Sequence, residues 1–552
     1  MDGSVAFRGV IGKILSGEIS TQEELDDAKR VICEKLGLSG FIRNSEILKH
    51  ARPSERKRLL VLLQKKPVRT ISGVAVVAAM TMPSKCPHGR CKYCPGGPDF
   101  DVPQSYTGKE PATRRAIQYN FNPYLQTTFR LHQLKTIGHP VDKVELIVMG
   151  GTLTAQMVDY QEWFVKQCFS AMNDVSRNFA LIKKLGSERF IERYQAKKKG
   201  FDYMEDVQTA NETAPVRCVG ITFEPRPDWC KQEQIDFMLG FGVTRVEMGV
   251  QNPDDKIYKM VDRGHTVKDV VEATAQLKDS GLKVGYHMMP GIVGYNHKRD
   301  LDAFKKIFSD QRFKPDMVKI YPCIILKGTE YYEQWKKGDF TPLSTEQAVD
   351  VIVKVKEIMP RWVRTMRIMR DIPSNLVEAG IKASNLGQLV YERMDEMHVK
   401  CNCIRCREVG RFLLQGIQPD VRDIELVRRD YQASKGTEVF LSFEDKKQDI
   451  LIGFLRLRIP HKPFRPEITS DTALVRELHV YGPLVELGEK PEFEWQHRGY
   501  GKELLAEAER IAREEFSMRK ILVTSGVGVR GYYRKLGYSS VGVYMGKRLS
   551  AG

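Results

Sequence analysis

Short apolar runs alternate with amphipathic stretches through the middle of the chain, from about Val74 to Pro322. The runs are typical of strands, and the stretches between them carry apolar residues at helical spacing. Strands that alternate with helices pair in parallel and form one covered sheet, whose chemistry lies at the carboxyl ends of the strands. A partial or complete (β/α) barrel is therefore predicted, with strands at Val74 to Thr81, Val144 to Met149, Cys218 to Phe223, Arg245 to Val250, Lys283 to Met288 and Met317 to Tyr321.

The two ends of the chain follow other patterns. From Met1 to about Ser72, apolar residues recur every three or four positions, which predicts helices. From about Asp423 onward, strands and helices mix in an α+β order that is too complete to be the tail of a barrel. The predicted elements there are strands at Val439 to Phe443, Ile450 to Leu457 and Val475 to Tyr481, a long helix from near Gly499, a strand at Ile521 to Thr524, and a short helix and strand after it.

Length and charge add two constraints. A chain of 552 residues and 63.2 kDa predicts at least two cores, and 42% hydrophobic with 28% charged residues is ordinary globular composition. The net charge of +17 indicates a polyanionic partner: nucleic acid, an anionic membrane surface or a phosphate-rich cofactor. No apolar run reaches the roughly 18 to 20 residues of a membrane span, and the first residues lack the pattern of a signal peptide. We expect a soluble, cytoplasmic protein with no membrane partner.

The charge is concentrated near the amino terminus. Between Lys49 and Arg69 stand eight Lys or Arg residues and one acidic residue, Glu55. A solvated helix face is the alternative, but so lopsided a ratio favours contact with nucleic acid phosphates. The candidate residues are Lys49, Arg52, Arg56, Lys57, Arg58, Lys65, Lys66 and Arg69.

Six of the eleven cysteines form two tight clusters, and close clusters in a large intracellular chain indicate metal. The other five, which are Cys33, Cys168, Cys218, Cys230 and Cys323, are expected to be small buried hydrophobes. The first cluster, Cys86, Cys91 and Cys94, follows the first predicted strand in the sequence CPHGRCKYCPGG. Three thiolates can hold a [4Fe-4S] cluster and leave one iron open, whereas a zinc site would need a fourth ligand such as His88.

This cluster, with Tyr93 before its last cysteine and the run MGGT at the end of the next strand, resembles the radical S-adenosylmethionine (SAM) superfamily. The resemblance implies that the open iron binds SAM and that the cofactor supplies a 5′-deoxyadenosyl radical. Glycines at a strand end allow the backbone to approach SAM closely. The candidate SAM-binding residues are Gly150, Gly151, Glu224, Glu247 and Gln251, and His287, Lys319 and Tyr321 stand at later strand ends.

The C-terminal sequence QHRGYG, followed by a helical stretch, resembles the pyrophosphate-binding motif of GCN5-related N-acetyltransferases (GNAT). Glycines at a helix amino terminus let backbone N–H groups face the phosphates of coenzyme A. The later sequence GYYRKLGY resembles the last helix of that family, where a tyrosine can donate a proton to the departing thiolate. Tyr532 and Tyr533 are the candidates, with core packing as the alternative for both.

Taken together, the blocks CPGGPD, QSYTG, GHPVDKVELIVMGGT, RGHTV, RDIP, REVG, VRELHVYG and SGVGVRGYYRKLGY resemble the Elongator catalytic-subunit family over nearly the whole chain. That family consists of tRNA wobble-uridine acetyltransferases, with stand-alone members in archaea and some bacteria. The resemblance implies that acetyl-CoA is hydrolysed or repositioned when the tRNA anticodon arm docks. It also implies that the adenosyl radical takes hydrogen from the acetyl methyl group, and that the carbon radical adds to C5 of uridine, giving 5-carboxymethyluridine.

By motif match, the same resemblance implies roles for individual residues. Lys143 contacts acetyl-CoA where two domains meet; without the match, an exposed charge before a strand is the simpler interpretation. Lys143, Tyr532, Tyr533 and His479 are the implied catalytic residues. The implied acetyl-CoA site comprises Lys143, Glu477, Leu478, His479, Val480, Tyr500, Gly501, Lys502 and Tyr533.

The second cluster, Cys401, Cys403 and Cys406, resembles a small zinc site between domains, with its fourth ligand unassigned. His398 is close in sequence but poorly spaced, and three reduced thiols without metal are the alternative. The predicted fold is a multidomain α/β protein. It has a helical basic tRNA-binding region over 1–73, a partial (β/α) radical SAM barrel over 74–395, a zinc-type linker over 396–415 and an α+β GNAT domain over 416–552.

Three other functions compete with this prediction. A protein lysine acetyltransferase with a structural iron–sulfur cluster would need neither tRNA nor SAM. A non-catalytic tRNA-binding scaffold would not need the motifs MGGT, QHRGYG and GYYRK. A radical SAM methylthiotransferase needs further cluster ligands, which the sequence lacks upstream. The predicted reaction also needs an external electron donor, and Elongator-like partner subunits are not expected to be required.

Overall fold

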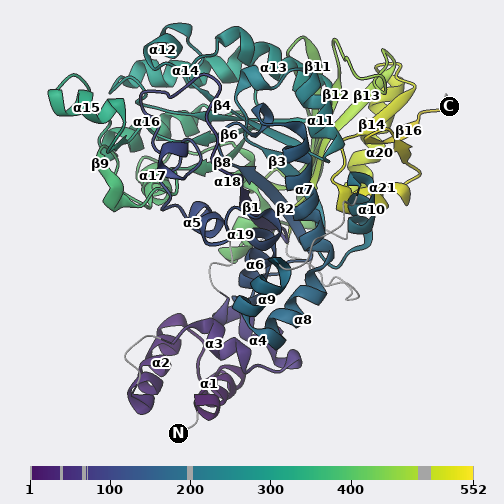
Figure 1. The fold of residues 1–552 in the computed structure, drawn as a ribbon. Coiled ribbons are helices and arrows are strands. Elements are labelled where there is room, and N and C mark those ends of the chain that lie inside the picture. Colours follow the sequence, from purple (N-terminus) through teal and green to yellow (C-terminus); the bar gives the residue numbers. More distant parts are fainter. Residues whose placement is uncertain are drawn as a thin grey trace.

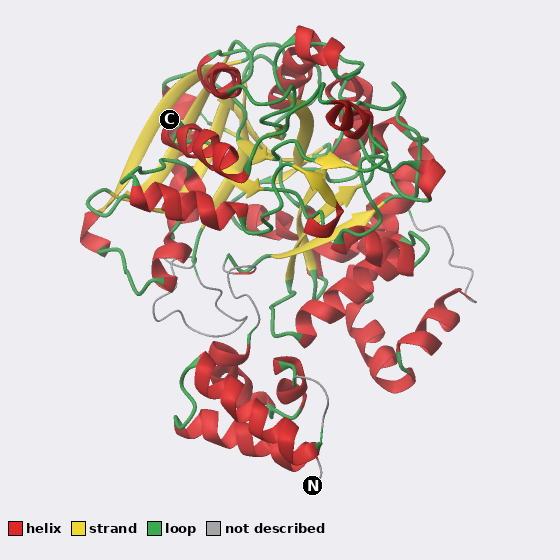
Figure 2. Cartoon of the chain, turned by 90° about the vertical axis from the view of Figure 1, so that its left-hand side faces the viewer, coloured by secondary structure: helices red, strands yellow, loops and turns green. Residues whose placement is uncertain are grey.

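The computed structural model describes residues 3–37, 42–64, 70, 72–195, 203–482 and 499–550. Three parts are visible in Figure 1: a small helical bundle at the amino terminus, a central sheet covered by helices, and a second sheet at the carboxyl terminus. Figure 2 shows the helical bundle projecting below the two sheets. The predicted fold class is confirmed.

The amino-terminal bundle consists of α1 (Gly3–Ser16), α2 (Gln22–Leu36), α3 (Asn44–Lys49) and α4 (Pro53–Leu63). Its apolar faces form a core of their own, which includes Ile11, Leu25 and Leu59. The bundle is linked to the next domain through His139, whose Nδ1 lies 2.8 Å from Thr70 Oγ1 and 3.2 Å from Gln64 Nε2.

The central sheet has seven parallel strands in the order β1-β2-β3-β4-β5-β6-β8. Each crossover moves one place along the sheet, and β1 and β8 are not paired in the described part of the chain, so the barrel is partial. The six predicted strands are present, and sequence patterning missed the seventh, β8. The strands are β1 (Ala75–Met80), β2 (Lys143–Met149), β3 (Arg217–Phe223), β4 (Arg245–Gln251), β5 (Lys283–Met288), β6 (Met317–Ile320) and β8 (Arg364–Ile368).

Helices on the outside of this sheet bury its apolar face. The core joins strand residues such as Leu146 and Val284 to helix residues such as Phe164 and Leu277. The helices of this part of the chain are α5 (Pro111–Gln118), α6 (Pro123–Thr136), α7 (Val158–Asn173), α8 (Val175–Leu185), α9 (Ser187–Gln195), α10 (Met204–Thr213), α11 (Gln232–Gly240), α12 (Asp255–Met260), α13 (Val267–Asp279), α14 (His297–Ser309), α15 (Glu330–Lys337), α16 (Thr345–Glu357) and α17 (Leu386–Glu396), of which α9 and α15 pack in smaller clusters of their own. A small antiparallel pair, β7 (Ile325–Leu326) and β9 (Val377–Ala379), lies beside α15.

Two short helices, α18 (Ile404–Arg407) and α19 (Val409–Leu414), lead to the second sheet, ordered β10-β11-β12-β13-β14-β16-β15. All its neighbours are antiparallel except β13 and β14. Sequence patterning missed β10, an edge strand. The strands are β10 (Ile424–Ala433), β11 (Gly436–Asp445), β12 (Ile450–Ile459), β13 (Thr472–Val480), β14 (Lys520–Val523), β15 (Ser539–Val541) and β16 (Tyr544–Arg548), with helices α20 (Tyr500–Glu514) and α21 (Arg530–Arg534).

The second sheet packs against the amino ends of the barrel strands. Arg476 on β13 donates to the carbonyl of Leu282, just before β5, and binds Asp316, just before β6. Gly526, after β14, lies against the backbone of Val219 in β3, where an added Cβ would be 2.1 Å from the carbonyl oxygen. The carboxyl ends of the barrel strands are therefore left open on the opposite side.

Candidate functional site

A cavity opens at the carboxyl ends of the barrel strands, directly above the first cysteine cluster. Cys91 and Cys94 are buried and Cys86 is partly exposed. The cavity wall comes from the cysteine loop, from the glycine turn after β2 and from the ends of β3, β4, β5 and β6. The lining includes Cys86, Cys91, Cys94, Gly150, Gly151, Glu224, Gln251, His287 and Tyr321.

The spread of the three thiols indicates what they can hold. A single tetrahedral zinc ion holds sulfurs at about 2.3 Å, so its ligand atoms lie close together. Cys401, Cys403 and Cys406 meet that condition, with all three sulfurs within 4.8 Å of one another, but Cys86, Cys91 and Cys94 do not. His88 Nε2 lies 3.2 Å from Cys91 Sγ without completing a compact ligand set. The wider spread fits a cluster of several irons better than one ion.

Polar groups are directed at these sulfurs. Gln104 Nε2 donates to Cys94 Sγ over 3.3 Å, and Arg263 Nη1 donates to Cys91 Sγ over 3.6 Å. Burial raises the pKa of the Cys94 thiol to about 11. His88 Nδ1, Tyr93 OH and Arg263 Nε are buried without a hydrogen-bond partner. Buried polar groups usually have partners, so these orphaned atoms fit a site built to hold a further group.

The glycine turn after β2 has the shape that the motif requires. Gly150 has φ +119°, and a Cβ there would be 2.4 Å from Thr81 Oγ1, which donates to the Gly150 carbonyl over 3.0 Å. Gly151, with φ +66°, faces the cavity and has no atom closer than 3.9 Å to an added Cβ. The pair therefore places bare backbone in the cavity wall.

Of three predicted SAM-binding side chains, two line the cavity and the third lies beneath its wall. Glu224 and Gln251 line the cavity, and Gln251 adopts φ +65°. Glu247 does not line it: only 1% of its side chain is exposed, and it pairs with Lys319 and with Arg245 while His287 Nε2 lies 3.1 Å from its carboxylate. Burial alone would raise the pKa of Glu247, but Lys319 and Arg245 hold it well below its usual value. Glu247 thus supports the wall from beneath.

A second opening lies in the other sheet, where β13 and β14 separate. They pair only from Thr472 to Val475, while β13 continues to Val480 beside β12. Beyond Val475, β13 does not pair with β14, and this half carries the predicted residues Glu477, Leu478, His479 and Val480, all partly exposed. The edge of a strand can bind an extended amide chain. Burial lowers the pKa of His479 to about 4, so its ring is neutral at pH 7.

The helix α20 begins beside this opening. Gly499, with φ +93°, precedes Tyr500, and the partly exposed Gly501 and the exposed Lys502 stand in the first turn. The amino terminus of a helix that begins with glycines is a typical place for a phosphate to bind. The preceding motif residues, Gln496, His497 and Arg498, lie outside the described residues.

The two adjacent tyrosines of α21 point in different directions. Tyr532 OH lies 3.1 Å from the position of a Cβ on Gly501, and 41% of the side chain is exposed. Tyr533 is buried in the core of this domain and packs against Tyr538, with ring centroids 5.8 Å apart. The hydroxyl next to the cofactor opening is therefore that of Tyr532.

Lys143 is the first residue of β2 and is partly buried at the end of the barrel that faces the second sheet. Its strand neighbour Arg217 contacts Gly528, where an added Cβ would lie 2.6 Å from Arg217 Cβ. Burial lowers the pKa of Lys143. The lysine thus lies close to the boundary between the two sheets.

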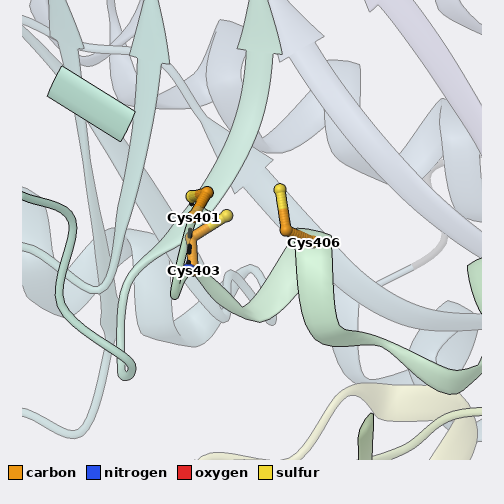
Figure 3. A group of neighbouring side chains, drawn as sticks. All are labelled: Cys401, Cys403 and Cys406. Carbon is orange, nitrogen blue, oxygen red and sulfur yellow. Dashed lines mark hydrogen bonds between the residues drawn. The ribbon is translucent and has the colours of Figure 1, made fainter. Parts of the chain in front are cut away.

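The second cysteine cluster brings its three sulfurs together between α17 and β8, as Figure 3 shows. Lys356, fully buried, donates to Cys403 Sγ and to Cys406 Sγ, each over 3.3 Å, and Thr365 on β8 donates to Cys403. Burial alone would lower the pKa of Lys356, but the thiolates hold it well above its usual value. His398, which the sequence spacing already disfavoured as a ligand, is exposed and does not belong to the group, so the fourth ligand stays unassigned.

The predicted basic surface lies on α4. Arg52, Lys57 and Arg58 are exposed and Arg56 is partly buried, while Glu55 is paired with Arg8 at 2.6 Å. Arg58 donates to the carbonyl of Leu15 and Arg56 to that of Lys135, so these two also hold the bundle in place. Lys65, Lys66 and Arg69 lie outside the described residues. Among the described helices, none is long and apolar enough to cross a membrane.

Family models cover most of the chain. They match the ELP3 N-terminal domain at 4–71, the Radical SAM superfamily at 80–307, the Radical SAM C-terminal domain at 315–396 and the Acetyltransferase (GNAT) family at 412–538. The ELP3 N-terminal match contains the basic helix α4, the Radical SAM C-terminal match contains β6 and β8, and the GNAT match contains the opening beside β13.

Known proteins are similar to this chain over most of its length. The chain is 55% identical to the tRNA uridine(34) acetyltransferase of Methanocaldococcus infernus, over 92% of each chain. It is 42% identical to the human Elongator complex protein 3, over 98% of this chain and 96% of the human one. A solved structure of the M. infernus Elp3 lacking residues 1–46 is 50% identical and has a TM-score of 0.74, covering 87% of this chain and all (100%) of that one.

Proposed function

Since this chain belongs to the family of the tRNA uridine(34) acetyltransferases and Elongator complex protein 3, we propose that it installs a carboxymethyl group at C5 of the tRNA wobble uridine. It is an acyltransferase of the radical SAM class. The observation that carries this function is the presence, in one chain, of a cysteine-lined cavity at the carboxyl ends of a radical SAM barrel and an acetyl-CoA opening in a GNAT sheet.

The family implies an iron–sulfur cluster, SAM and acetyl-CoA. We assign Cys86, Cys91 and Cys94 as ligands of a [4Fe-4S] cluster, because their spread and the orphaned polar atoms around them fit such a group. When bound, the cluster and SAM supply the adenosyl radical. Gly150, Gly151, Glu224 and Gln251 then position SAM, while the pairs around Glu247 keep the wall beneath them rigid.

In the second sheet, we assign acetyl-CoA to the opening between β13 and β14. The part of β13 that extends past its pairing with β14, at Glu477, Leu478, His479 and Val480, would receive the pantetheine arm, and Tyr500, Gly501 and Lys502 its phosphates. Tyr532 is placed to donate a proton to the thiolate that leaves when the thioester is cleaved. Lys143 would act from the barrel side.

Tyr532 and Tyr533 differ in one testable way. Tyr532→Phe is expected to lower the rate of tRNA-stimulated acetyl-CoA hydrolysis by about 10²-fold, the lower end of what a positioned general acid contributes. Tyr533→Phe should change it little, because its ring packs in the core. Single-turnover hydrolysis of radiolabelled acetyl-CoA measures both. The assignment fails if Tyr533→Phe has the larger effect and unfolds at the same temperature as the native protein.

We propose that Cys401, Cys403 and Cys406 bind zinc. The three close sulfurs match the geometry of a single ion, and the protonated Lys356 offsets their negative charge. Cys406→Ser should reduce bound zinc from about one per chain to a small fraction of that, measured by elemental analysis. Cys33→Ser, in a thiol outside both clusters, is the control. Unchanged zinc in Cys406→Ser would contradict the site.

For tRNA, we propose that the exposed cations of α4 contact the phosphates of the anticodon arm. Replacing Arg52 and Lys57 together by alanine should weaken tRNA binding and reduce the salt slope of log K by about one per residue. The measurement is filter binding across a salt series. Arg30→Ala in α2, where the cation already pairs with Asp27 at 3.1 Å, is the matched control. Equal slopes for the native protein and the double variant would place the tRNA elsewhere.

The experiment that tests the whole function uses unmodified tRNA, acetyl-CoA, SAM and a chemical reductant with the anaerobically reconstituted protein. We expect 5-carboxymethyluridine at the wobble position, detected by mass spectrometry of digested tRNA, without added partner subunits. A protein lysine acetyltransferase with a structural cluster would instead acetylate protein without tRNA or SAM, and that outcome would overturn the proposal.

A further inference from the structure

The segment Arg263-Gly264-His265 follows α12 and packs against the first cysteine loop, and no role in the proposed reaction has been given to it. The loop and the segment are joined by a hydrogen bond from the N–H of Lys92 to the carbonyl of Val261, 3.2 Å long. Gly264, with φ +71°, leaves room for His88, whose Cβ would lie 2.5 Å from a Cβ at that position. The segment is thus fitted closely to the loop that carries the thiols.

Arg263 is the residue of this segment that reaches the thiols. Nη1 donates to Cys91 Sγ over 3.6 Å, and Nη2 donates to the Gly249 carbonyl over 2.5 Å. Gly249 is required for this position, because an added Cβ would be 2.5 Å from Nη2. The residue is only 8% exposed. The guanidinium is therefore held rigidly between β4 and the cysteine loop.

No carboxylate among the described residues lies within ion-pair distance of Arg263, and its two hydrogen bonds go to a sulfur and a backbone carbonyl. Arg226, also in the cavity wall, differs: it forms a two-pronged pair with Asp228 at 2.8 and 2.9 Å. A buried cation without a counter-charge is costly unless an anion faces it. The anion available to Arg263 is whatever Cys91 ligates.

We propose that Arg263 is a positioning residue that balances the charge of the iron–sulfur cluster through Cys91 and so raises the cluster's reduction potential. This inference rests on the proposed ligation of a [4Fe-4S] cluster by Cys86, Cys91 and Cys94. Reduction adds one negative charge to a cluster that is already anionic when three thiolates hold it. A fixed positive charge and a hydrogen bond at one sulfur therefore stabilise the reduced form more than the oxidised form.

The consequence concerns the supply of electrons rather than the contact with substrate. The electron donor must reduce the cluster before SAM is cleaved, and a higher potential makes that reduction more complete with a given donor. Neutralising the charge at position 263 should make the cluster harder to reduce while leaving its three ligands in place. The effect is distinct from loss of a ligand, which removes the cluster.

The test is a redox titration of the full-length, reconstituted protein, followed by the electron paramagnetic resonance signal of the reduced cluster. Arg263→Gln removes the charge, and Arg263→Lys retains it on a different donor. We expect Arg263→Gln to lower the equilibrium constant for reduction at least tenfold, which is about 59 mV for a one-electron couple. Arg263→Lys should lie closer to the native potential. Arg465→Gln is the control, because it removes a largely buried guanidinium that pairs with Glu467 and Asp236 in another region.

The possible results distinguish failure of this inference from failure of the proposed function. A native potential in Arg263→Gln overturns the inference, and so does equal behaviour of the glutamine and lysine variants, since charge is then not the cause. If Arg263→Gln takes up no iron while Arg263→Lys loads fully, the charge is required to hold the anionic cluster, which supports the inference. A native protein that binds no cluster would instead contradict the proposed function.

Discussion

Replacing Cys91 by alanine is expected to abolish the iron–sulfur cluster, the formation of 5′-deoxyadenosine and the carboxymethylation of tRNA, all below detection. Cys91 is the central thiol of the loop, 3% exposed, with Arg263 and His88 both directed at its sulfur. Two thiolates cannot replace three in holding a cuboidal cluster with one open iron. Acetyl-CoA binding should persist, because the opening at β13 belongs to the second sheet. That sheet packs against the amino ends of the barrel strands, at the end opposite to the cysteine loop.

The measurements are iron content, visible absorbance, deoxyadenosine by chromatography and acetyl-CoA affinity by calorimetry. Cys323→Ala is the matched control, because Cys323 is a buried thiol in the same apolar cluster as Cys91 but outside the loop. That variant should retain four irons' worth of absorbance and full deoxyadenosine formation. A Cys91→Ala protein that still cleaved SAM would disprove the three-thiol assignment.

Sequence patterning predicted the barrel because most residues of its central strands are buried. Residues such as Leu146, Val246 and Val284 have no exposed surface, so the strands are continuous apolar runs. The strand β8 escaped prediction because its sequence RTMRI is the last in the sheet and carries two arginines. The strand β10 was missed for the same reason. It is the edge strand of the second sheet, and exposed charged residues interrupt its apolar positions.

The sequence predicted those parts of the candidate site that depend on the spacing of residues along the chain. It did not predict the parts that depend on the direction in which a side chain points. Cysteine and glycine motifs placed Cys86, Gly150 and Gly151 in the cavity wall. Spacing cannot tell which of two adjacent tyrosines is buried, whereas the structure places Tyr532 beside Gly501 and Tyr533 in the core. Nor can it show that Glu247 lies beneath the wall, since its partners Lys319 and His287 come from the strands β6 and β5.

The boundary between the two sheets was also invisible in the sequence, because it is ionic where a domain boundary is usually apolar or hydrated. Asp316, which is fully buried, binds Arg476 through two contacts of 2.7 Å. It also faces Lys278 at 3.3 Å and Arg456 at 3.6 Å. Glu438 is the second anion of this group, paired with Arg476 and Arg458. The group joins the amino ends of β5 and β6 to β11, β12 and β13.

Replacing Asp316 by asparagine is therefore expected to destabilise the native state by about 3 to 5 kcal/mol, since removing one partner leaves buried charge uncompensated. Burial alone would raise the pKa of Asp316, but Arg476, Lys278 and Arg456 hold it well below its usual value. Its contribution is thus present above the ordinary carboxyl pKa of about 3.9 and is lost as pH falls through the depressed value. Urea unfolding at pH 7 measures the loss.

The control is Asp420→Asn, which removes a carboxylate paired with an exposed arginine, Arg422, and should leave stability nearly unchanged. Because Arg476 neighbours Glu477, Asp316→Asn should also weaken acetyl-CoA binding before the protein unfolds. That result would indicate that the charges joining the two sheets also orient β13. An Asp316→Asn protein with native stability would show instead that Glu438 alone balances the cations at the boundary.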